Sequence, residues 1–233
     1  MSIFLENIVK SYGSNIILNN ITYSFDRNKI YGLIGRNGAG KTTLLKTICR
    51  LISDNTGNII IDDQCVNKYD YFRIPLSYIT DTPVYYQDLT IKEHLLTICY
   101  SQKIKRNEAV EKCSHIINEM KLQQYQDSFP ATLSKGTIQR LNIAMGLLRN
   151  VDIFLMDEPF SSLDPVQVKI IERKISKMKN EKTIQLISSH DIDSLATICD
   201  IFLILKNGNL IECDPKIITK EEIAILIDDS YGE

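Results

Sequence analysis

Tryptophan, long apolar runs and an excess of basic residues are all missing from this sequence. The longest apolar runs, such as residues 201–205, fall far short of the roughly 20 residues that cross a bilayer, so we expect no direct membrane span. The first residues have neither a basic region nor a long apolar stretch, which argues against a signal peptide. Without a spanning run, any membrane role is expected to be peripheral. A net charge of -2 gives no sign of the basic face that nucleic-acid binding needs.

Cysteine pairs with C-x-x-C spacing are also lacking, and no cysteine lies beside a histidine at metal-ligand spacing. We therefore expect buried or unreactive thiols in a reducing cytosol. The six positions are Cys49, Cys65, Cys99, Cys113, Cys199 and Cys213.

Short apolar runs alternate with helical patterns along most of the chain, which predicts an α/β fold with a parallel sheet. A mostly helical stretch from about residue 90 to 148 interrupts the strands and predicts an inserted helical subdomain. The first 26 residues contain shorter strands, which predict an antiparallel β subdomain at the edge. The strands expected in the parallel sheet are 30–34, 152–156, 183–188 and 201–205, and those in the antiparallel part are 3–6, 16–18, 21–25 and 58–61.

Several element boundaries carry local signals. Residues 90–93 and 219–222 both have the T-x-x-E spacing of a capping box at a helix start. Asp164 followed by Pro165 is typical of an N-cap and the first helical position. Asn207-Gly208 predicts a tight hairpin turn.

The strongest motif is Gly35-Arg-Asn-Gly-Ala-Gly-Lys-Thr42, which fits G-x-x-x-x-G-K-[ST] in full. A strand is expected directly before it and an amphipathic helix reaching Leu51 directly after it. Glycines let backbone amides turn inward around phosphate oxygens, and the helix dipole adds attraction. Lys41 can reach the β- and γ-phosphates and Thr42 can bind Mg²⁺, so a chance glycine-rich turn is disfavoured.

A second motif is the apolar strand that ends in Asp157 and Glu158. Open α/β sheets hold ligands at this end of their strands. Asp157 can hold Mg²⁺, usually through water, and Glu158 can polarise the attacking water as a general base. Taken alone, two acids after a strand are as often a solvated strand end; the phosphate loop favours the catalytic interpretation.

A third motif, Leu133-Ser134-Lys135-Gly136, opens a further predicted helix running to about Arg149. Ser134 is typical of an N-cap, and such a helix start can bind phosphate through its amides. By itself this segment is better explained as an ordinary capped helix.

Together, and in this order, the motifs resemble the ABC ATPase family. The order is phosphate loop, L-S-x-G with its helix, strand-Asp-Glu-Pro, residues 161–164, and His190 after a strand. The resemblance covers residues 3 to about 213. The motifs in this order are together highly specific, whereas each motif after the phosphate loop is weak when taken alone. It implies an ATPase that binds ATP and Mg²⁺ between two nucleotide-binding subunits, most simply a homodimer. It also implies a separate transmembrane permease as partner, with the chain cytoplasmic and peripheral on the inner face of the cell membrane.

The resemblance also implies roles for individual residues. Tyr12 would stack on adenine, with a structural strand-end tyrosine as the alternative. Ser134 and Gly136 would close on the γ-phosphate bound by the other subunit, and Asp164 would cross the dimer interface. His190 would contact the γ-phosphate in catalysis, with a helix-capping or core histidine as the alternative. The phosphate-loop residues implied in nucleotide binding are Gly35, Asn37, Gly38, Gly40, Lys41, Thr42 and Thr43.

Two departures from the family pattern affect this interpretation. Lys135 replaces the commoner Gly and Thr137 the frequent Gln, which resembles a bacterial, often exporting, branch. Asp81 lies where the family usually has a Gln that touches Mg²⁺ and the water. Asp81 can still offer an oxygen as a catalytic and metal residue, or it is a plain turn residue before Pro83. Tyr85 and its neighbour Tyr86 could meet a partner helix or pack the subdomain.

We therefore predict a transport ATPase, with export of peptide or drug-like cargo. Two alternatives remain: a soluble ABC ATPase of translation or DNA repair, disfavoured by the single cassette, and a non-catalytic nucleotide-binding regulator, which Asp81 leaves open. His94 and His115 are expected to be structural. The expected segments are 1–79 (nucleotide-binding core with the antiparallel β part), 80–150 (helical subdomain), 151–215 (rest of the core) and 216–233 (C-terminal helix and tail).

Overall fold

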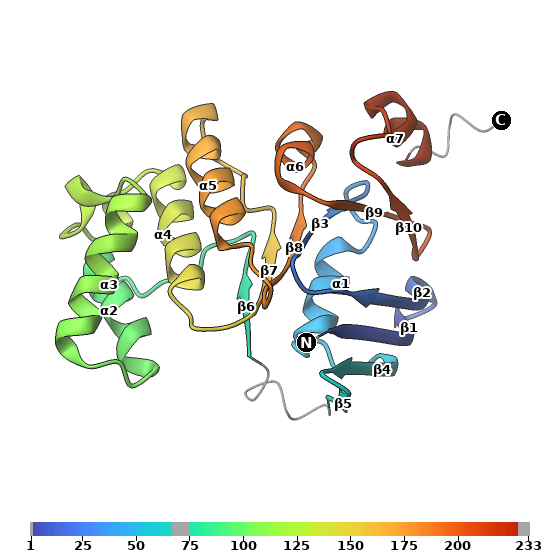
Figure 1. The fold of residues 1–233 in the computed structure, drawn as a ribbon, viewed down its shortest axis with the longest axis horizontal. Coiled ribbons are helices and arrows are strands. Elements are labelled where there is room, and N and C mark those ends of the chain that lie inside the picture. Colours follow the sequence, from blue (N-terminus) through green and yellow to red (C-terminus); the bar gives the residue numbers. More distant parts are fainter. Residues whose placement is uncertain (1, 67–74, 228–233) are drawn as a thin grey trace.

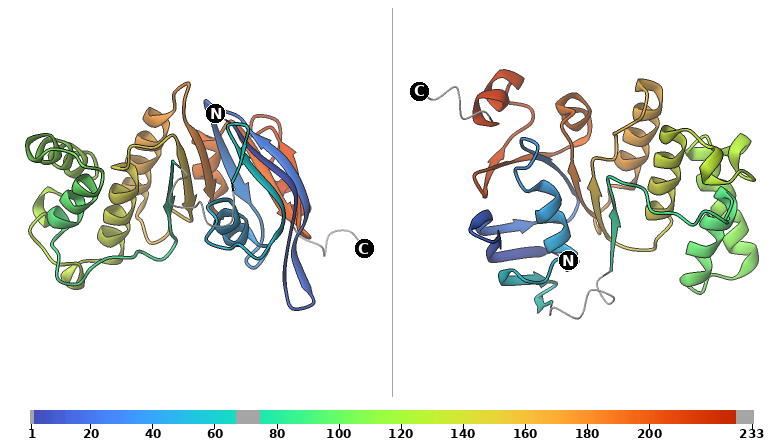
Figure 2. Two further views of the ribbon diagram at one scale, coloured as in Figure 1. Left: turned by 90° about the horizontal axis from the view of Figure 1, so that it is seen from below. Right: turned by 180° about the vertical axis from the view of Figure 1, so that it is seen from behind.

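The computed structural model describes residues 2–66 and 75–227. Within them, the chain forms two sheets with helices packed around the larger one (Figures 1 and 2). The α/β architecture with an antiparallel β part and a helical part is therefore confirmed. Among the described helices, none combines the length and the apolar character needed to cross a membrane.

The smaller sheet is antiparallel and has the strand order β2-β1-β4-β5. The observed strands β1 and β2 are longer than the predicted ones. The predicted strands stopped where irregularities interrupt the apolar alternation of the sequence. Asn7 in β1 and Asn20 in β2 have left-handed backbones, with φ of 51° and 53°, and the register shifts between Leu5 and Ile8. The strand bounds are β1 (Ile3–Tyr12), β2 (Asn15–Phe25), β4 (Thr56–Ile61) and β5 (Gln64–Cys65).

The larger sheet has the order β10-β9-β3-β8-β7-β6. All its pairings are parallel except that of β10 with β9, which is the predicted hairpin. Asn207 and Gly208 form its turn with φ of 49° and 76°, as a tight hairpin requires. The strands are β3 (Lys29–Ile34), β6 (Leu76–Ile79), β7 (Ile153–Asp157), β8 (Ile184–Ser188), β9 (Ile201–Lys206) and β10 (Asn209–Cys213).

The helices whose starts carry sequence signals begin where those signals predict. Thr90 and Glu93 form a complete capping box, and Asp164 caps its helix by accepting from the Gln167 amide at 2.8 Å. The helix after the phosphate loop is shorter than predicted: it ends at Ile48, and Leu51 lies outside it with 56% of its surface exposed. The helices are α1 (Lys41–Ile48), α2 (Ile91–Ser101), α3 (Arg106–Glu119), α4 (Lys135–Leu147), α5 (Pro165–Met178), α6 (Ile192–Ile198) and α7 (Lys220–Ile227).

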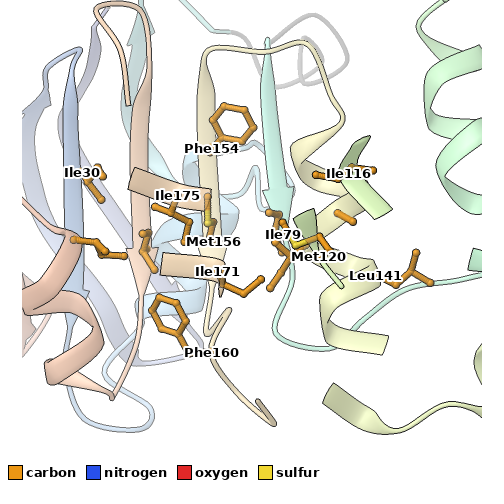
Figure 3. Close-up of a cluster of buried hydrophobic side chains, with 14 of the residues drawn as sticks. Ile30, Ile79, Ile116, Met120, Leu141, Phe154, Met156, Phe160, Ile171 and Ile175 are labelled. Atoms are coloured by element: carbon orange, nitrogen blue, oxygen red, sulfur yellow. The ribbon is translucent and has the colours of Figure 1, made fainter. Parts of the chain in front are cut away.

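Two hydrophobic cores lie on opposite faces of the larger sheet. Successive residues of a strand alternate between them: Leu155 belongs to the core shared with α1 and the antiparallel strands, and Met156 to the core under α4 and α5. The second core continues into the helical part, where Leu141 of α4 lies with Ile79 of β6 and Met120 (Figure 3). This alternation anchors the strand ends, and therefore the residues that follow them, from both sides.

Helices α2 and α3 lie at one end of the molecule and the antiparallel sheet at the other (Figure 1). Helix α1 packs between the antiparallel sheet and the larger one, because its buried residues Leu44, Leu45 and Ile48 belong to the core that both sheets share. The phosphate loop, which joins β3 to α1, is therefore held between two packed layers.

Candidate functional site

The phosphate loop turns sharply between β3 and α1. Gly38 and Gly40 have φ of 84° and 104°, a region that side chains other than glycine rarely adopt. A Cβ at Gly40 would also lie only 2.6 Å from the Cγ2 of Ile17 in β2. No side chain caps α1 and no acid lies in its first turn, so its positive end is available to an anion.

Lys41 is folded back over this loop. Its buried ammonium donates to the Gly35 carbonyl at 2.8 Å and lies 3.4 Å from the Arg36 carbonyl. The same Nζ lies 3.8 Å from an oxygen of Glu158. Carbonyl acceptors and a carboxylate thus hold the cation at the loop, where a phosphate can exchange for them.

A cavity of about 310 Å³ opens over the loop and brings together residues from four parts of the chain. Asp81 follows β6 and Glu158 follows β7, so the two acids reach the cavity from neighbouring strand ends. The lining residues are Ile17, Arg36, Asn37, Gly38, Gly40, Lys41, Thr42, Thr43, Asp81 and Glu158.

Asp157 is not among the residues that line this cavity. It is fully buried at the end of β7, and its two oxygens accept from Ser188 Oγ at 2.6 Å and from the Tyr78 hydroxyl at 3.1 Å. Burial, and then the neighbouring carboxylate of Asp157, raises the pKa of Tyr78 well above its usual range. Tyr78 therefore remains a hydrogen-bond donor, and the Asp157 side chain is fixed in one orientation.

Glu158 lies on the turn that leaves β7. Its φ of 46° is uncommon for a residue with a side chain. The Glu158 amide bonds to the Ser188 carbonyl at 3.0 Å, which joins this turn to β8. One carboxylate oxygen lies 2.9 Å from His190 Nδ1 and accepts from the His190 amide at 3.3 Å. Glu158 is therefore placed between Lys41 and His190.

His190 follows β8, and its side chain is largely exposed. Beside it a second cavity, of about 600 Å³, extends along residues 160–165 and the start of α6. The imidazole thus bonds to Glu158 on one side and faces open space on the other.

The other predicted residues lie away from the loop cavity. Ser134 caps α4 by accepting from the Thr137 amide at 3.2 Å. A Cβ on Gly136 would lie 2.9 Å from the Ser162 carbonyl and 2.8 Å from a side-chain oxygen of Gln167, so the start of α4 packs tightly against the segment around Asp164. Neither Ser134, Gly136 nor Asp164 lines the cavity over the phosphate loop.

Tyr12 is also outside that cavity. Its ring, at the end of β1, is 52% exposed and lies 4.3 Å from the ammonium of Lys10, measured to the ring centroid. Asp81 does line the cavity, while one of its oxygens accepts from the Thr82 amide at 2.7 Å. Of the residues implied by the resemblance, the structure thus gathers Asp81 and Glu158 at the phosphate loop, with His190 bonded to Glu158, whereas Tyr12 does not line the cavity.

Sequence analysis missed the two hydroxyl donors to Asp157. Tyr78 and Ser188 come from the strands on either side of β7, and Ser188 is paired with Asp157 in the β7–β8 register. The only available signal was a polar residue in each of two apolar strands. His94, expected to be structural, accepts from the Tyr86 amide at 2.9 Å and contacts the Thr90 carbonyl at 2.7 Å, so it fixes the loop before α2.

All six cysteines are free, three of them fully buried, and Cys99 and Cys113 lie 3.8 Å apart between their sulfurs. Across residues 2–66 and 75–227, no three His, Cys, Asp or Glu side chains are grouped so as to hold a metal by themselves.

Comparisons with known proteins agree with this geometry. The family described as ABC transporter matches residues 18–161. The bacitracin transport ATP-binding protein BcrA of Enterococcus faecalis is 31% identical over 210 residues, covering 89% of this chain and 67% of BcrA.

Two solved structures share the fold. The structure of an ATP-binding subunit of an ABC transporter has 27% identity and a TM-score of 0.86, covering 97% of this chain and 99% of that one. A dimeric ATP-binding cassette bound to ADP and Pi has 23% identity and a TM-score of 0.82, covering 91% of this chain and 98% of the other. The chain belongs to the ABC transporter family as an ATP-binding subunit, and it is an ATPase of that type.

Proposed function

We propose that two copies of this subunit close head to tail over two Mg-ATP molecules and drive a separate transmembrane permease. The observation that carries the proposal is the grouping of Lys41 and Glu158 at the loop cavity, with His190 bonded to Glu158 and with Ser134 and Gly136 outside the cavity. One copy then supplies the phosphate loop and the base, and the other supplies the start of α4. Closure on ATP and release after hydrolysis would do the mechanical work.

The nucleotide would bind with its phosphates on the loop. The uncapped start of α1, together with Lys41, offers amides and a cation to the β- and γ-phosphates. Thr43, beside Thr42 on the first turn, also lines this cavity. Tyr12 is exposed and able to stack on adenine if the base extends beyond the cavity.

The oxygen donors here suit a hard cation such as Mg²⁺. Thr42 and Asp81 line the cavity, and Asp157 is held rigidly by Tyr78 and Ser188. Magnesium prefers oxygen ligands and usually keeps several waters, so Thr42 and ATP would bind it directly and Asp157 through water. When bound, the ion would neutralise charge developing on the phosphates.

Glu158 would act as general base and His190 as its partner. The carboxylate of Glu158 lies between a cation and an imidazole, so a water over the γ-phosphate could pass its proton to Glu158. His190 would hold this carboxylate in place and offer its other ring nitrogen to a phosphate oxygen.

The requirement for a second copy follows from where Ser134 lies. Because Ser134, Gly136 and Asp164 line no part of the loop cavity, we expect them to contact ATP that is bound by another copy. Ser134 is exposed at the start of α4, and Asp164 caps the neighbouring α5. Both would therefore lie on the face that the partner covers.

The partner in the membrane would be a permease bound near the loop after Asp81. Val84 and Tyr86 in this loop are 73% and 69% exposed, so they offer apolar surface to a partner. BcrA is named for transport of bacitracin, which supports export of peptide or drug-like cargo. The subunit would then be cytoplasmic, peripheral on the inner face of the membrane, with residues 80–150 as the docking subdomain.

Lys41→Ala tests the nucleotide site directly. A hydrogen bond to a charged group is worth about 1.5–3 kcal/mol, so ATP affinity should fall about 10- to 100-fold. Titration of the purified variant with ATP measures this, and Lys46→Ala on the same helix, outside the cavity, is the matched control. Unchanged affinity in Lys41→Ala would show that ATP binds elsewhere. Normal binding without any phosphate release by the wild type would favour the non-catalytic regulator.

A further inference from the structure

A chain of three polar side chains ends at the exposed serine that opens α4. The guanidinium of Arg140 lies 3.2 Å from the Thr137 hydroxyl, and this hydroxyl lies 2.9 Å from the hydroxyl of Ser134. Arg140 and Thr137 are 5% and 2% exposed, whereas Ser134 faces solvent. The chain therefore runs from the interior to the surface that would meet ATP on a second copy.

Hydrogen-bond chemistry gives this chain a single direction. Arginine has donors only, so Arg140 Nη2 must donate to the Thr137 oxygen. The Thr137 hydroxyl is buried and needs an acceptor for its own proton, and Ser134 Oγ is the acceptor that the structure provides. If Ser134 donated to Thr137 instead, a buried hydroxyl hydrogen would be left without a partner, at a cost in stability.

Ser134 consequently accepts twice. Its oxygen takes the Thr137 hydroxyl proton at 2.9 Å and the Thr137 amide at 3.2 Å. Both lone pairs of Ser134 are then in use, and its own hydrogen is free to point away from α4. The serine is left as a donor aimed outwards, which is what a phosphate oxygen requires.

The buried end of the chain is fixed by α3. Arg140 Nη1 donates at 2.9 Å to the carbonyls of both Met120 and Lys121, the two residues after α3. These carbonyls are at the negative end of a helix, which attracts the guanidinium. The position of α3 thus fixes Arg140, and through it the side chain of Thr137.

We propose that Thr137 is a positioning residue that turns the Ser134 hydroxyl into an oriented donor for the γ-phosphate of ATP held by a second copy. The inference rests on the proposed head-to-tail dimer and adds to it how the serine is oriented. It assigns to Thr137 a role that the usual glutamine at this position would have to fill with different geometry. Movement of α3 against α4 would then shift Arg140 and Thr137 and so change the orientation of the Ser134 hydroxyl at the nucleotide.

Thr137→Val tests the proposal, because valine keeps the shape of threonine and removes the hydroxyl. Loss of one neutral hydrogen bond predicts roughly a 2- to 10-fold rise in the ATP concentration that half-saturates dimer formation in a Glu158→Gln background. In the Thr137→Val variant that retains Glu158, the hydrolysis rate should fall by a similar factor. Affinity for ADP should not change, because ADP has no γ-phosphate for Ser134 to contact. Thr137→Ser should restore both readouts.

A double-variant cycle with Ser134→Ala separates positioning from general packing. If Thr137 acts through Ser134, adding Thr137→Val to Ser134→Ala should shift half-saturation by less than about 2-fold. The matched control is Thr132→Val, which removes an exposed hydroxyl bonded to the Phe129 carbonyl and should leave every readout at the wild-type level. Thermal unfolding of each variant shows whether the fold is intact.

Three results would overturn the proposal. The first is a Thr137→Val variant whose half-saturation and hydrolysis rate equal those of wild type. The others are a Thr137→Val effect of full size in the Ser134→Ala background, and a Thr137→Ser variant that is as impaired as Thr137→Val. Failure of the proposed function is visible separately. In that case ATP would drive no dimer formation even in the Glu158→Gln variant, or Ser134→Ala would leave dimer formation and hydrolysis at the wild-type level, whereas failure of the positioning role alone would leave Ser134→Ala impaired.

Discussion

Replacement of Glu158 by glutamine distinguishes chemistry from structure at this site. Glutamine keeps the size of the side chain and can still accept from the His190 amide, now 3.3 Å from the carboxylate. Lys41 loses a carboxylate at 3.8 Å but retains the carbonyl of Gly35 at 2.8 Å. Because glutamine keeps these contacts and the long contact to Lys41 is replaced by an amide oxygen, the free energy of unfolding should change much less than the activation free energy does.

The expected change in rate is much larger. Loss of a general base typically slows a reaction about 10²- to 10⁴-fold, which is roughly 2.7–5.4 kcal/mol of activation free energy. ATP should still bind, because the phosphate loop is untouched, and the trapped ATP state should favour a dimer. Stability and rate should therefore separate by several kcal/mol in this single variant.

Phosphate release at saturating Mg-ATP measures the rate, thermal unfolding the stability, and size-exclusion chromatography with ATP the dimer. Glu111→Gln is the matched control, because Glu111 is an exposed acid on α3, away from the cavity. A Glu158→Gln variant that hydrolyses within about 3-fold of wild type would refute the general-base assignment. If His190→Ala then abolished hydrolysis, His190 rather than Glu158 would be the base.

The remaining predictions concern Asp81 and the cysteines. The Asp81→Gln variant should hydrolyse ATP at the wild-type rate or faster. The Asp81→Ala variant should show a changed Mg²⁺ dependence of hydrolysis and weaker coupling to the permease. If the Mg²⁺ curves of wild type and Asp81→Ala superimpose and transport is unaffected, Asp81 is a plain turn residue. Burial raises the pKa of Cys49 to about 11 and, as the main cause, that of Cys113 to about 12, so less thiolate is present at pH 8. Exposed Cys65 should therefore be alkylated by iodoacetamide well before both, as mass spectrometry can show, and rapid labelling of Cys49 in the folded protein would contradict its packing.

Local signals predicted much of the fold, because they act over three or four residues. The capping box at Thr90 and the hairpin turn at Asn207 both formed as the sequence indicates. The prediction of Leu51 in α1 was wrong, although its spacing fits the apolar face. The chain leaves the helix before it: Arg50 has φ of 59°, and its guanidinium reaches the Val66 carbonyl. That contact is 16 residues away and gives no signal in a helical pattern.

The antiparallel strands show the opposite error. Sequence analysis ended the first strand at residue 6, just before Asn7, and divided β2 into 16–18 and 21–25 on either side of Asn20. Both asparagines have left-handed backbones within continuous strands, and asparagine tolerates this conformation better than most residues. Cross-strand pairing, which the alternation does not describe, carries the strands through these irregularities.

The sequence by itself determined the phosphate loop and the types of chemical group available, because eight contiguous residues specify the turn, the cation and the hydroxyl. Only the tertiary structure decided which side chains meet. Tyr78 and Ser188 reach Asp157 because three parallel strands align in one register, and Arg140 reaches the carbonyls of Met120 and Lys121 because α4 packs beside the end of α3. The separation of Ser134 from the loop cavity of its own copy was likewise settled by packing. Such contacts join residues far apart in the chain, and their geometry depends on how sheets and helices pack rather than on any local pattern.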